Sequence, residues 1–464
     1  MPTRLQSLAC NLVALRTEQR RYGGSFRSIL QAVEDRSGWR QEQVVEFRDY
    51  RLREFLRYTV EWSPYYRSRL GKLGVSVSDS KSMADLIRQL PILRKRDIQN
   101  CSDALKPKNL AVSSKLVVHT SGTTGSGLKF WTTRLAMQEQ WAVWWRYRRW
   151  HGIDLNMWCG YFGGRVMASP SQLGPPFWRV NYPAKQIMFS GNHMTPANLP
   201  GYIKELRRQR PPWLHGYPSL LALLASYLLD RRMDLGYTPK WVTSGAENLL
   251  PNQADLIYRG LGVRPRQHYG MAEAVANFSE CEQGRLHVDE DFAAVEFVPT
   301  GDSECTYRVV GTNFSNPLTP LVRYDVDDIV TLFPGNCSCG RPGRIVERVD
   351  GRTSDYVVLR HGRVLGPVNH LFKWTTTVLQ AQLHQSVPGE VTIRIVRGEG
   401  YSESDQERIL CEVGRRLGPG NQVSLEYVDE IQRSASGKYR AVISEIIGRE
   451  TNVSDCSASN QVAQ

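Results

Sequence analysis

The sequence lacks a long hydrophobic run. No stretch approaches the roughly 20 apolar residues that a membrane-spanning helix needs, although apolar residues make up 41% of the chain. The run SLACNLVAL near the N-terminus is short, and Asn11 interrupts it, so we expect an amphipathic helix and no membrane span. The nine cysteines are odd in number, and without an export signal they indicate reduced thiols. We therefore expect a cytoplasmic protein.

A nucleic-acid-binding module is also missing. Lys and Arg outnumber Asp and Glu by 59 to 46, a formal charge of +13, and a basic surface favours nucleic acid, acidic membranes, ATP and CoA. No basic block with interleaved aromatics resembles a known nucleic-acid module. The nearest, WWRYRRW at 144–150, has the spacing of an amphipathic helix with one arginine face. Nucleic-acid binding would rest on charge alone, and we expect no nucleic-acid partner.

The 464 residues suit one large domain and one smaller domain, without internal repeats or low-complexity tracts. Residues 1–105 have mostly helical patterns. From 115 to about 340, strand-like runs alternate with helical patterns, which predicts an α/β core with helices packed over sheets. The polar, turn-rich VERVDGRTSD at 346–355 predicts the start of a small α+β domain. The predicted organisation is a domain over 1–349, a second over 350–450, and a disordered tail over 451–464.

The most informative segment is VVHTSGTTGSGLKF at 117–130, where a strand-like run enters a loop rich in glycine and hydroxyl residues. Its glycines let backbone amides turn toward a phosphate, and its hydroxyls add donors. A Walker-type loop needs Lys directly after the last glycine, whereas Leu128 and Lys129 follow here, which disfavours a Walker NTPase. The candidate phosphate-binding residues are Ser121, Gly122, Thr123, Thr124, Gly125 and Lys129.

This loop and five later motifs resemble the adenylate-forming superfamily, which contains acyl-CoA synthetases. HGYPSLL and CSCGR are similar to segments of its phenylacetate-CoA ligase-like branch, polysaccharide-biosynthesis members above all. Six ordered motifs are far more specific than one. The later motifs are SGAE at 244–247, HYGMAE at 268–273, VRYDVDDIV at 322–330, VDGRTSD at 349–355 and SASGKYR at 434–440.

The resemblance implies a large adenylate-forming N-terminal α/β domain with layered sheets and helices, plus a small mobile α+β C-terminal domain. It also implies that the chain activates a small-molecule carboxylic acid with ATP and Mg²⁺, forming acyl-AMP and pyrophosphate. Transfer to CoA is usual in the family, while a carrier-protein thiol, an amine or a sugar hydroxyl stay open as acceptors. The acid cannot be read from the sequence, although YFGGRV, HGYPS and SGAE are expected to line its site, where Arg165 is one candidate for pairing with a charged group.

The resemblance also suggests roles for single residues. Lys438 is implied to bring a cation to the site from the small domain, although SGK alone is a common surface turn. Glu273 is implied to act in catalysis as an oxygen ligand for Mg²⁺, Tyr269 to lie near the adenine, and Asp328 to bind the ribose, with its assignment resting on the spacing from the preceding Arg-Tyr. Further implied nucleotide-binding residues are Gly245, Ala246, Glu247, Gly270 and Arg352.

Two positions depart from the family pattern. The residue before the motif glutamate is usually Thr or Ser and is Ala272 here, which removes a donor worth about 1 kcal/mol. The hinge aspartate is replaced by Ser354, with Asp355 one residue later. Ala272 favours an alternative function: a catalytically weak protein of this fold that serves as a binding or biosynthetic partner.

Four residues form a candidate zinc site. Thiolates and imidazole are the ligands that Zn²⁺ prefers, and three cysteines with one histidine complete a closed tetrahedral set of the structural kind. Members of the resembled branch often have Cys and His at matching places. The alternative is four unligated residues in loops. The predicted ligands are Cys281, His287, Cys337 and Cys339.

Overall fold

The computed structural model divides the chain into two compact units. The first comprises Met1–Arg352 together with Arg433–Tyr439, and the second comprises Thr353–Gln432 and Arg440–Gln464. The short segment 433–439 therefore belongs with the large unit although it follows most of the small one. The structure describes residues 3–73, 77, 82–108, 115–119, 128–165, 167–168, 172, 174–300, 305–352, 357–361, 364–365, 377–398, 400–433 and 439–446.

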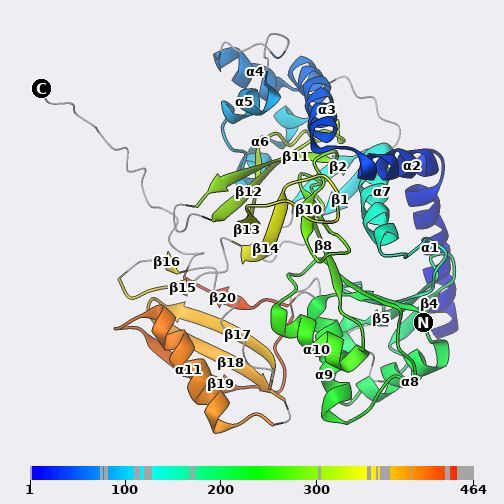
Figure 1. The fold of residues 1–464 in the computed structure, drawn as a ribbon, viewed down its shortest axis with the longest axis vertical. Coiled ribbons are helices and arrows are strands. Elements are labelled where there is room, and N and C mark those ends of the chain that lie inside the picture. The colour runs from blue at the N-terminus through cyan, green and yellow to red at the C-terminus, as the bar shows by residue number, and fades with distance from the viewer. Residues whose placement is uncertain are drawn as a thin grey trace, which may run out of the picture. The chain divides into compact units, whose positions relative to one another are not determined.

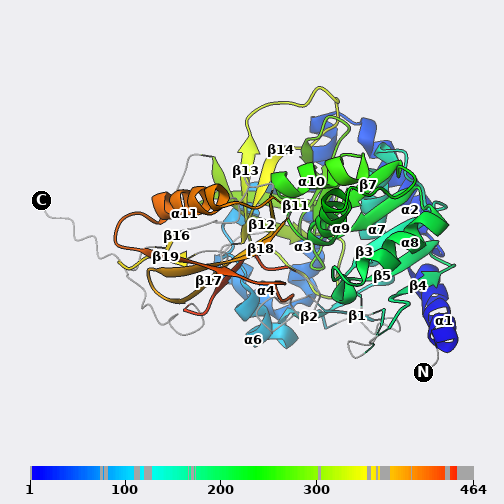
Figure 2. The ribbon, with the colours of Figure 1, turned by 90° about the horizontal axis from the view of Figure 1, so that it is seen from below.

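The N-terminal hundred residues are helical, as the sequence predicts. The first helix, α1, lies alongside a strand at the edge of the main sheet (Figures 1 and 2). No helix within the described ranges has both the length and the apolar character needed to cross a bilayer. The helices are α1 (Thr3–Tyr22), α2 (Phe26–Asp35), the short 3₁₀ helix η1 (Arg36–Gly38), α3 (Gln41–Trp62), α4 (Pro64–Leu73), α5 (Met83–Arg88) and α6 (Lys95–Leu105).

A twelve-stranded sheet forms the centre of the first unit, and β1 (Leu116–His119) and β2 (Lys129–Thr132) form a separate antiparallel pair. The large sheet joins an antiparallel half to a parallel half through one strand, β8. Its strands, in spatial order, are β11 (Ala293–Pro299), β12 (Thr306–Asn313), β13 (Tyr324–Phe333), β14 (Ile345–Arg352), β10 (Leu286–Val288), β9 (Asn277–Glu280), β8 (Arg266–Gly270), β7 (Trp241–Ser244), β6 (Trp213–Gly216), β3 (Cys159–Gly163), β5 (Gln186–Ser190) and β4 (Trp178–Asn181).

Helices cover both faces of the parallel half because its side chains alternate between the faces. Phe162 and Leu214 belong to the apolar cluster under α8 and α9, whereas Cys159 and Trp213 pack with α2 and α7 on the opposite face. Runs with apolar residues on both faces are typical of buried parallel strands. Helices α9 and α10 lie side by side (Figure 1). The helices of this half are α7 (Arg134–Trp150), η2 (Gly191–His193), α8 (Leu199–Gln209), α9 (Pro218–Asp230) and α10 (Pro251–Leu261).

The second unit is a small α+β structure. A four-stranded sheet in the order β19, β18, β17, β20 packs its apolar side against one helix through residues such as Ile393, Ile395 and Val413. A two-stranded pair is formed by β15 (Val357–Val358) and β16 (Val364–Leu365). The remaining elements are β17 (Val378–Val387), β18 (Glu390–Arg397), α11 (Glu403–Leu417), β19 (Gln422–Tyr427) and β20 (Val442–Ser444).

Two local predictions differ from the structure. The segment predicted to be turn-rich at 346–355 begins as a strand, because β14 pairs with both β13 and β10 and extends the sheet to Arg352. WWRYRRW is helical, as predicted, but its arginines do not form one solvent-facing side. Arg146 and Arg148 are 3% and 5% exposed. Carboxylates from a distant turn bind Arg146, whereas rings of α7 itself and of Trp213 lie beside Arg148.

The turn between β10 and β11 is an acidic hub that binds arginines from the helices. Arg146 of α7 donates to Asp289 at 2.7 Å and to Asp291 at 2.8 Å, and Arg36 donates to Asp291 at 2.6 Å. All of these side chains are buried. Although burial opposes ionisation, Arg146 and Arg36 lower the pKa of Asp291 to about 2, so its carboxylate is charged.

The middle residue of the same turn extends the hub. Glu290 is 1% exposed and accepts from Arg48 of α3 at 2.7 Å and from Arg344 at 2.6 Å. Buried charges are costly unless they are paired and hydrogen-bonded, and here every carboxylate has guanidinium partners. The hub thereby connects α2, α3 and α7 to one end of the sheet.

We expect Arg146→Met to lower the free energy of unfolding by about 3–5 kcal/mol, because it leaves Asp289 and Asp291 buried without their shared cation. Urea denaturation of the whole chain measures this. The matched control is Arg57→Met, which removes an exposed pair with Glu54 (47% and 51% exposed) and should change stability by less than about 1 kcal/mol. Equal effects of the two variants would contradict the hub.

Candidate active site

Two strained turns lie at the carboxyl ends of the neighbouring parallel strands β7 and β8. Ala246 follows β7 with φ = 67°, and Ala274 lies four residues beyond β8 with φ = 57°. Left-handed backbone is unfavourable for alanine and concentrates at functional sites. In open α/β sheets, ligands bind outside the carboxyl ends of the strands. SGAE and HYGMAE, two of the predicted nucleotide motifs, form these turns, so the fold brings them to one edge of the sheet.

A hydrogen bond joins the HYGMAE and VRYDVDDIV motifs. The Tyr269 hydroxyl donates to Asp328 Oδ2 at 2.6 Å, and the Tyr269 ring stacks on Phe278 with centroids 4.5 Å apart. Tyr269 is the penultimate residue of β8 and Asp328 lies on β13, so the bond fixes one carboxylate orientation between residues 59 apart in the chain. Arg352, another predicted nucleotide-binding residue, is the strand partner of Asp328 on β14.

The neighbouring aspartates have different surroundings, which separates them as candidates. Asp325 is 3% exposed, forms an ion pair with Arg308 at 3.3 Å, and accepts from the backbone N–H of Asp327. Asp327 itself is exposed, with φ = 63°. Asp325 is thus committed to holding the strand turn, whereas Asp328 is half-buried and accepts from Tyr269.

The other described motif residues differ in their surroundings. Glu273 lies in the turn after β8, where its backbone carbonyl accepts from Asn313, and Ala272 packs beside the apolar cluster of the N-terminal helices. Gly270 has no room for a side chain, because a Cβ there would lie 2.6 Å from Asn277 Oδ1. Lys129 is exposed on β2.

Glu247, which the family resemblance implies to bind nucleotide, contacts residues at both ends of the segment 433–439. Its Oε1 accepts from the backbone N–H of Tyr439 at 2.7 Å and lies 3.8 Å from Arg433 Nη1. Its Oε2 accepts from Ser219 N, while Arg433 also donates to Ser219 Oγ at 2.8 Å. The side chains of Glu247 and Arg433 are only 9% and 12% exposed. Both ends of the segment are therefore held at the carboxyl end of β7.

Several predicted residues lie outside the described residues, and their positions are not assigned. Lys438 falls between the two described anchors Arg433 and Tyr439. The hinge positions Ser354 and Asp355 are also outside. The same holds for the phosphate-loop residues Ser121, Gly122, Thr123, Thr124 and Gly125.

Arg165 lies apart from these strand ends. It lines a cavity of about 670 Å³ formed mainly by α1 with β4, β5 and the chain after β3. Arg21 and Arg179 also line this cavity, whereas none of the nucleotide motifs described above does. The structure thus does not bring Arg165 together with the SGAE and HYGMAE turns.

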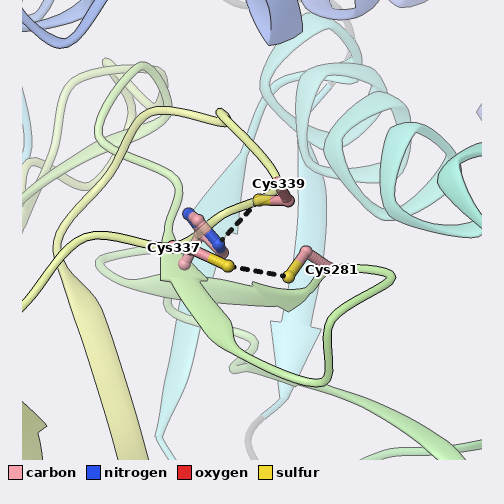
Figure 3. Close-up of side chains that lie close together, drawn as sticks. Cys281, Cys337 and Cys339 are labelled. Atoms are coloured by element: carbon pink, nitrogen blue, oxygen red, sulfur yellow. Dashed lines mark hydrogen bonds between the residues drawn. The ribbon is translucent and has the colours of Figure 1, made fainter.

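The four predicted metal ligands do converge. The Sγ atoms of the three cysteines and a ring nitrogen of His287 all lie within 4.8 Å of one another. Cys281 and Cys337 sulfurs are 3.7 Å apart, and Cys339 Sγ is 3.4 Å from His287 Nε2 (Figure 3). Bond lengths of about 2.3 Å to sulfur and about 2.0 Å to nitrogen in a tetrahedron require separations of about 3.8 and 3.5 Å. The separations of 3.7 Å between two sulfurs and 3.4 Å between sulfur and nitrogen agree with these values.

Local structure explains why these residues meet. Cys281 directly follows β9 and His287 lies on β10 of the same hairpin. The loop between β13 and β14 carries Cys337 and Cys339 beside this hairpin, since β14 pairs with β10. His287 Nδ1 donates to the Pro342 carbonyl at 3.0 Å, which leaves Nε2 unprotonated and directed at Cys339. Burial lowers the pKa of His287, which also favours the neutral, metal-binding form.

Sequence reasoning missed the partners of Glu247. Arg433 and the Tyr439 backbone are 186 and 192 residues away, and no local pattern marks them. It also missed the ring cluster of Tyr161, His215 and His268, whose members lie in segments quoted for the site but are brought onto one face only by strand register.

Comparison with solved structures establishes the class of fold. The chain matches the crystal structure of 2-hydroxyisobutyryl-CoA ligase in the postadenylation state, in complex with 2-HIB-AMP, with a TM-score of 0.66 at 19% identity. The match covers 88% of this chain and 90% of that one. The predicted α/β fold of an adenylate-forming ligase with a C-terminal domain is confirmed.

Sequence relatives indicate a family in addition to the fold. Protein CapK of Staphylococcus aureus is 27% identical over 417 residues, covering 87% of this chain and 90% of that protein. A phenylacetate-coenzyme A ligase of Thermus thermophilus is 24% identical, covering 69% and 73%. Residues 360–445 match the family model of the CapK C-terminal domain. Relatives and fold together support the adenylate-forming superfamily, and within it the phenylacetate-CoA ligase-like branch, as the group that this chain resembles.

Proposed function

We propose that this chain is an ATP-dependent acid ligase that converts a carboxylic acid to an acyl-adenylate and then passes the acyl group to CoA or another acceptor. The comparisons support an acid-CoA-ligase-like enzyme at that level. The identity of the acid, the acceptor and the residue roles are part of the proposal. A place in polysaccharide biosynthesis rests on the CapK relative alone.

In the first half-reaction, a carboxylate oxygen of the acid attacks the α-phosphorus of ATP and pyrophosphate leaves. Such chemistry depends on positioning and on neutralising charge. Asp328, oriented by Tyr269, would bind the ribose, and Gly270 keeps the end of β8 free of side-chain bulk. Glu273 would supply the carboxylate ligand for Mg²⁺, an ion that neutralises phosphate charge when bound.

One observation carries the proposal for Lys438. Arg433 and Tyr439, the described residues on either side of the segment that contains Lys438, both contact Glu247 at the carboxyl end of β7. Lys438 immediately precedes Tyr439, whose backbone N–H is fixed at 2.7 Å from the Glu247 carboxylate. This supports delivery of the lysine cation to the large unit during adenylate formation, with Glu247 and Arg433 as positioning residues.

In the second half-reaction, the acceptor thiol attacks the acyl carbon, a thioester forms, and AMP leaves with the acyl–oxygen bond broken and the thiol proton released. Lys438 is not needed at the α-phosphate in that step. The segment that contains Lys438 must therefore be able to leave the large unit between the two steps. Its contacts with Glu247 suit such a release, because they comprise one hydrogen bond from the Tyr439 backbone and one ion pair with Arg433.

We expect Lys438→Ala to cut acid-dependent exchange of labelled pyrophosphate into ATP by about 10²-fold, as for loss of one charge-stabilising group. ATP binding should persist, and acyl-AMP supplied ready-made should still react with CoA. An equal loss in both half-reactions would indicate a folding defect. Unchanged exchange would show that SGK is a surface turn, and absence of exchange with every acid would favour the catalytically weak alternative.

Glu247→Gln should slow the same exchange by about tenfold, because it removes the countercharge of half-buried Arg433 and weakens the bond to Tyr439 N. Transfer from ready-made acyl-AMP should keep the wild-type rate. The matched control, Asp255→Asn, removes an exposed pair with Arg259 on α10 and should leave both steps unchanged. If Glu247→Gln slows both steps alike, Glu247 does not position the segment for adenylate formation.

We further propose that the three cysteines and the histidine bind one structural Zn²⁺. The support is the soft donor set and its separations, together with the fixed tautomer of His287. Burial and the neighbouring thiols raise the pKa of Cys339 to about 12, and a cation at the centre would offset that cost by stabilising thiolates. Four protein ligands leave no position for water, so no catalytic step is assigned to the metal.

Protein purified without added metal should contain close to one equivalent of zinc by elemental analysis. Cys339→Ser should lose the zinc and lower the melting temperature, because metal-binding energy is folding energy in such sites. Cys411→Ser, which alters an exposed cysteine on α11, should keep both metal and stability. A zinc-free wild-type protein with an unchanged melting temperature after chelator treatment would disprove the site.

A further inference from the structure

Helix α7 buries two arginines, two residues apart, in opposite electrostatic settings. Arg146 is 3% exposed and bound by two carboxylates. Arg148 is 5% exposed, and no hydrogen bond or ion pair joins its guanidinium to any residue in the described part of the chain. Burial lowers the pKa of Arg148, whereas the nearby carboxylates overcome burial and raise the pKa of Arg146. Arg148 therefore lacks the countercharge that its neighbour has.

Aromatic rings, and not anions, surround Arg148. Its guanidinium carbon lies 4.8 Å from the ring centroid of Trp145, 5.3 Å from that of Trp213 and 5.9 Å from that of Trp141. Cation–π contacts offset part of the cost of burying the charge, but they satisfy none of the five guanidinium N–H donors. A buried donor without a hydrogen-bond partner lowers the stability of the fold. The buried Nε of Arg148 is such a donor, so a bound ligand could supply its acceptor.

The strand face beneath α7 gathers aromatic and imidazole rings near Arg148. Register places Tyr161, His215 and Thr243 side by side on β3, β6 and β7, and the ring of His268 lies 6.4 Å from that of His215. His215, His268 and Tyr161 are half-buried, unlike the fully buried rings behind them. His268 Nδ1 makes no hydrogen bond within the described residues. A Cβ at Gly245 would lie 2.9 Å from the His268 ring, so the close packing of the SGAE turn on this ring requires glycine.

This strand face is the part of the site that we expect to bind the carboxylic acid. Tyr161, His215 and Gly245 come from the three segments YFGGRV, HGYPS and SGAE that were expected to line the site of the acid, and His268 begins the nucleotide motif HYGMAE. Burial, and next the charge of Arg148, lower the pKa values of His215 and His268, so both rings are neutral. The face therefore presents one cation among neutral rings.

We infer that Arg148 selects the acid, and that the preferred substrate carries a second anionic group, a carboxylate, on its acyl part. This inference rests on the proposed function. A carboxylate would accept the free guanidinium donors in a charge-assisted pair and supply the missing countercharge. The rings around it would pack against the carbon skeleton between the two carboxyl groups. Arg148 is thus a specificity-determining residue, separate from the groups assigned to the reacting phosphate.

Paired acids with matched skeletons test the inference: hexanoate against adipate, and phenylacetate against 4-carboxyphenylacetate. In acid-dependent pyrophosphate exchange, the wild-type chain should favour the diacid of a pair by about tenfold or more in kcat/KM, as a site built to bind a charged group does. Arg148→Met should abolish or reverse this preference while exchange with the monoacid persists. Arg149→Met, which alters exposed pairs with Glu34 and Asp154 on the same helix, should keep it.

The outcomes separate the two proposals. Exchange that favours the monoacids, or a diacid preference that survives in Arg148→Met, overturns the role of Arg148 and leaves the proposed function intact. Exchange with no acid at all overturns the proposed function and the inference with it. If Arg148→Met does not fold, as judged by its melting curve, Arg148→Lys keeps the charge but loses the two-pronged geometry, and a diacid preference reduced by less than threefold in that variant contradicts recognition by the guanidinium.

Discussion

The structure depends on pairing the buried carboxylates of the Asp289–Asp291 turn with arginines from four other segments. These arginines come from the chain after α2, from α3, from α7 and from the chain before β14. Helix α7 is thereby fixed over the parallel strands, and its fixed position holds Arg148 and the tryptophans over the face that bears His215. The β10–β11 turn also follows directly on His287, so the hub and the cysteine cluster stabilise the same end of the sheet.

The candidate site results from where parallel strands end. Carboxyl ends of β6, β7 and β8 place the HGYPS, SGAE and HYGMAE segments at one edge, and long side chains from the antiparallel half reach the same place, as the Tyr269–Asp328 bond shows. Glu247 then holds a segment that lies almost 190 residues later in the chain. The Glu247 carboxylate accepts from the backbone N–H groups of Tyr439 and Ser219 and pairs with Arg433. Each of these contacts is individually modest, so together they are suited to holding the segment reversibly.

Much of the fold was predictable because its signals are local. The helical lead-in, the strands at 116–119, 241–244 and 306–313, and the helix over LLALLASYLLD follow from hydrophobic periodicity. The segment at 346–352 was predicted wrongly because its polar residues satisfy a strand only through pairing with β13 and β10. The arginines of α7 were predicted on one face of the helix, and the burial of Arg146 required carboxylates more than 140 residues away.

The sequence by itself determined the order of the motifs, the chemistry of the four soft ligands and the absence of a Walker lysine after the loop, because residue type and spacing are sufficient for each. Only the tertiary structure decided that Cys281 and His287 meet Cys337 and Cys339, that Asp325 is committed to Arg308 while Asp328 receives Tyr269, and that Arg148 lacks a carboxylate where Arg146 has two. Each of these depends on strand register and on contacts between distant segments, and the sequence contains no local signal for either.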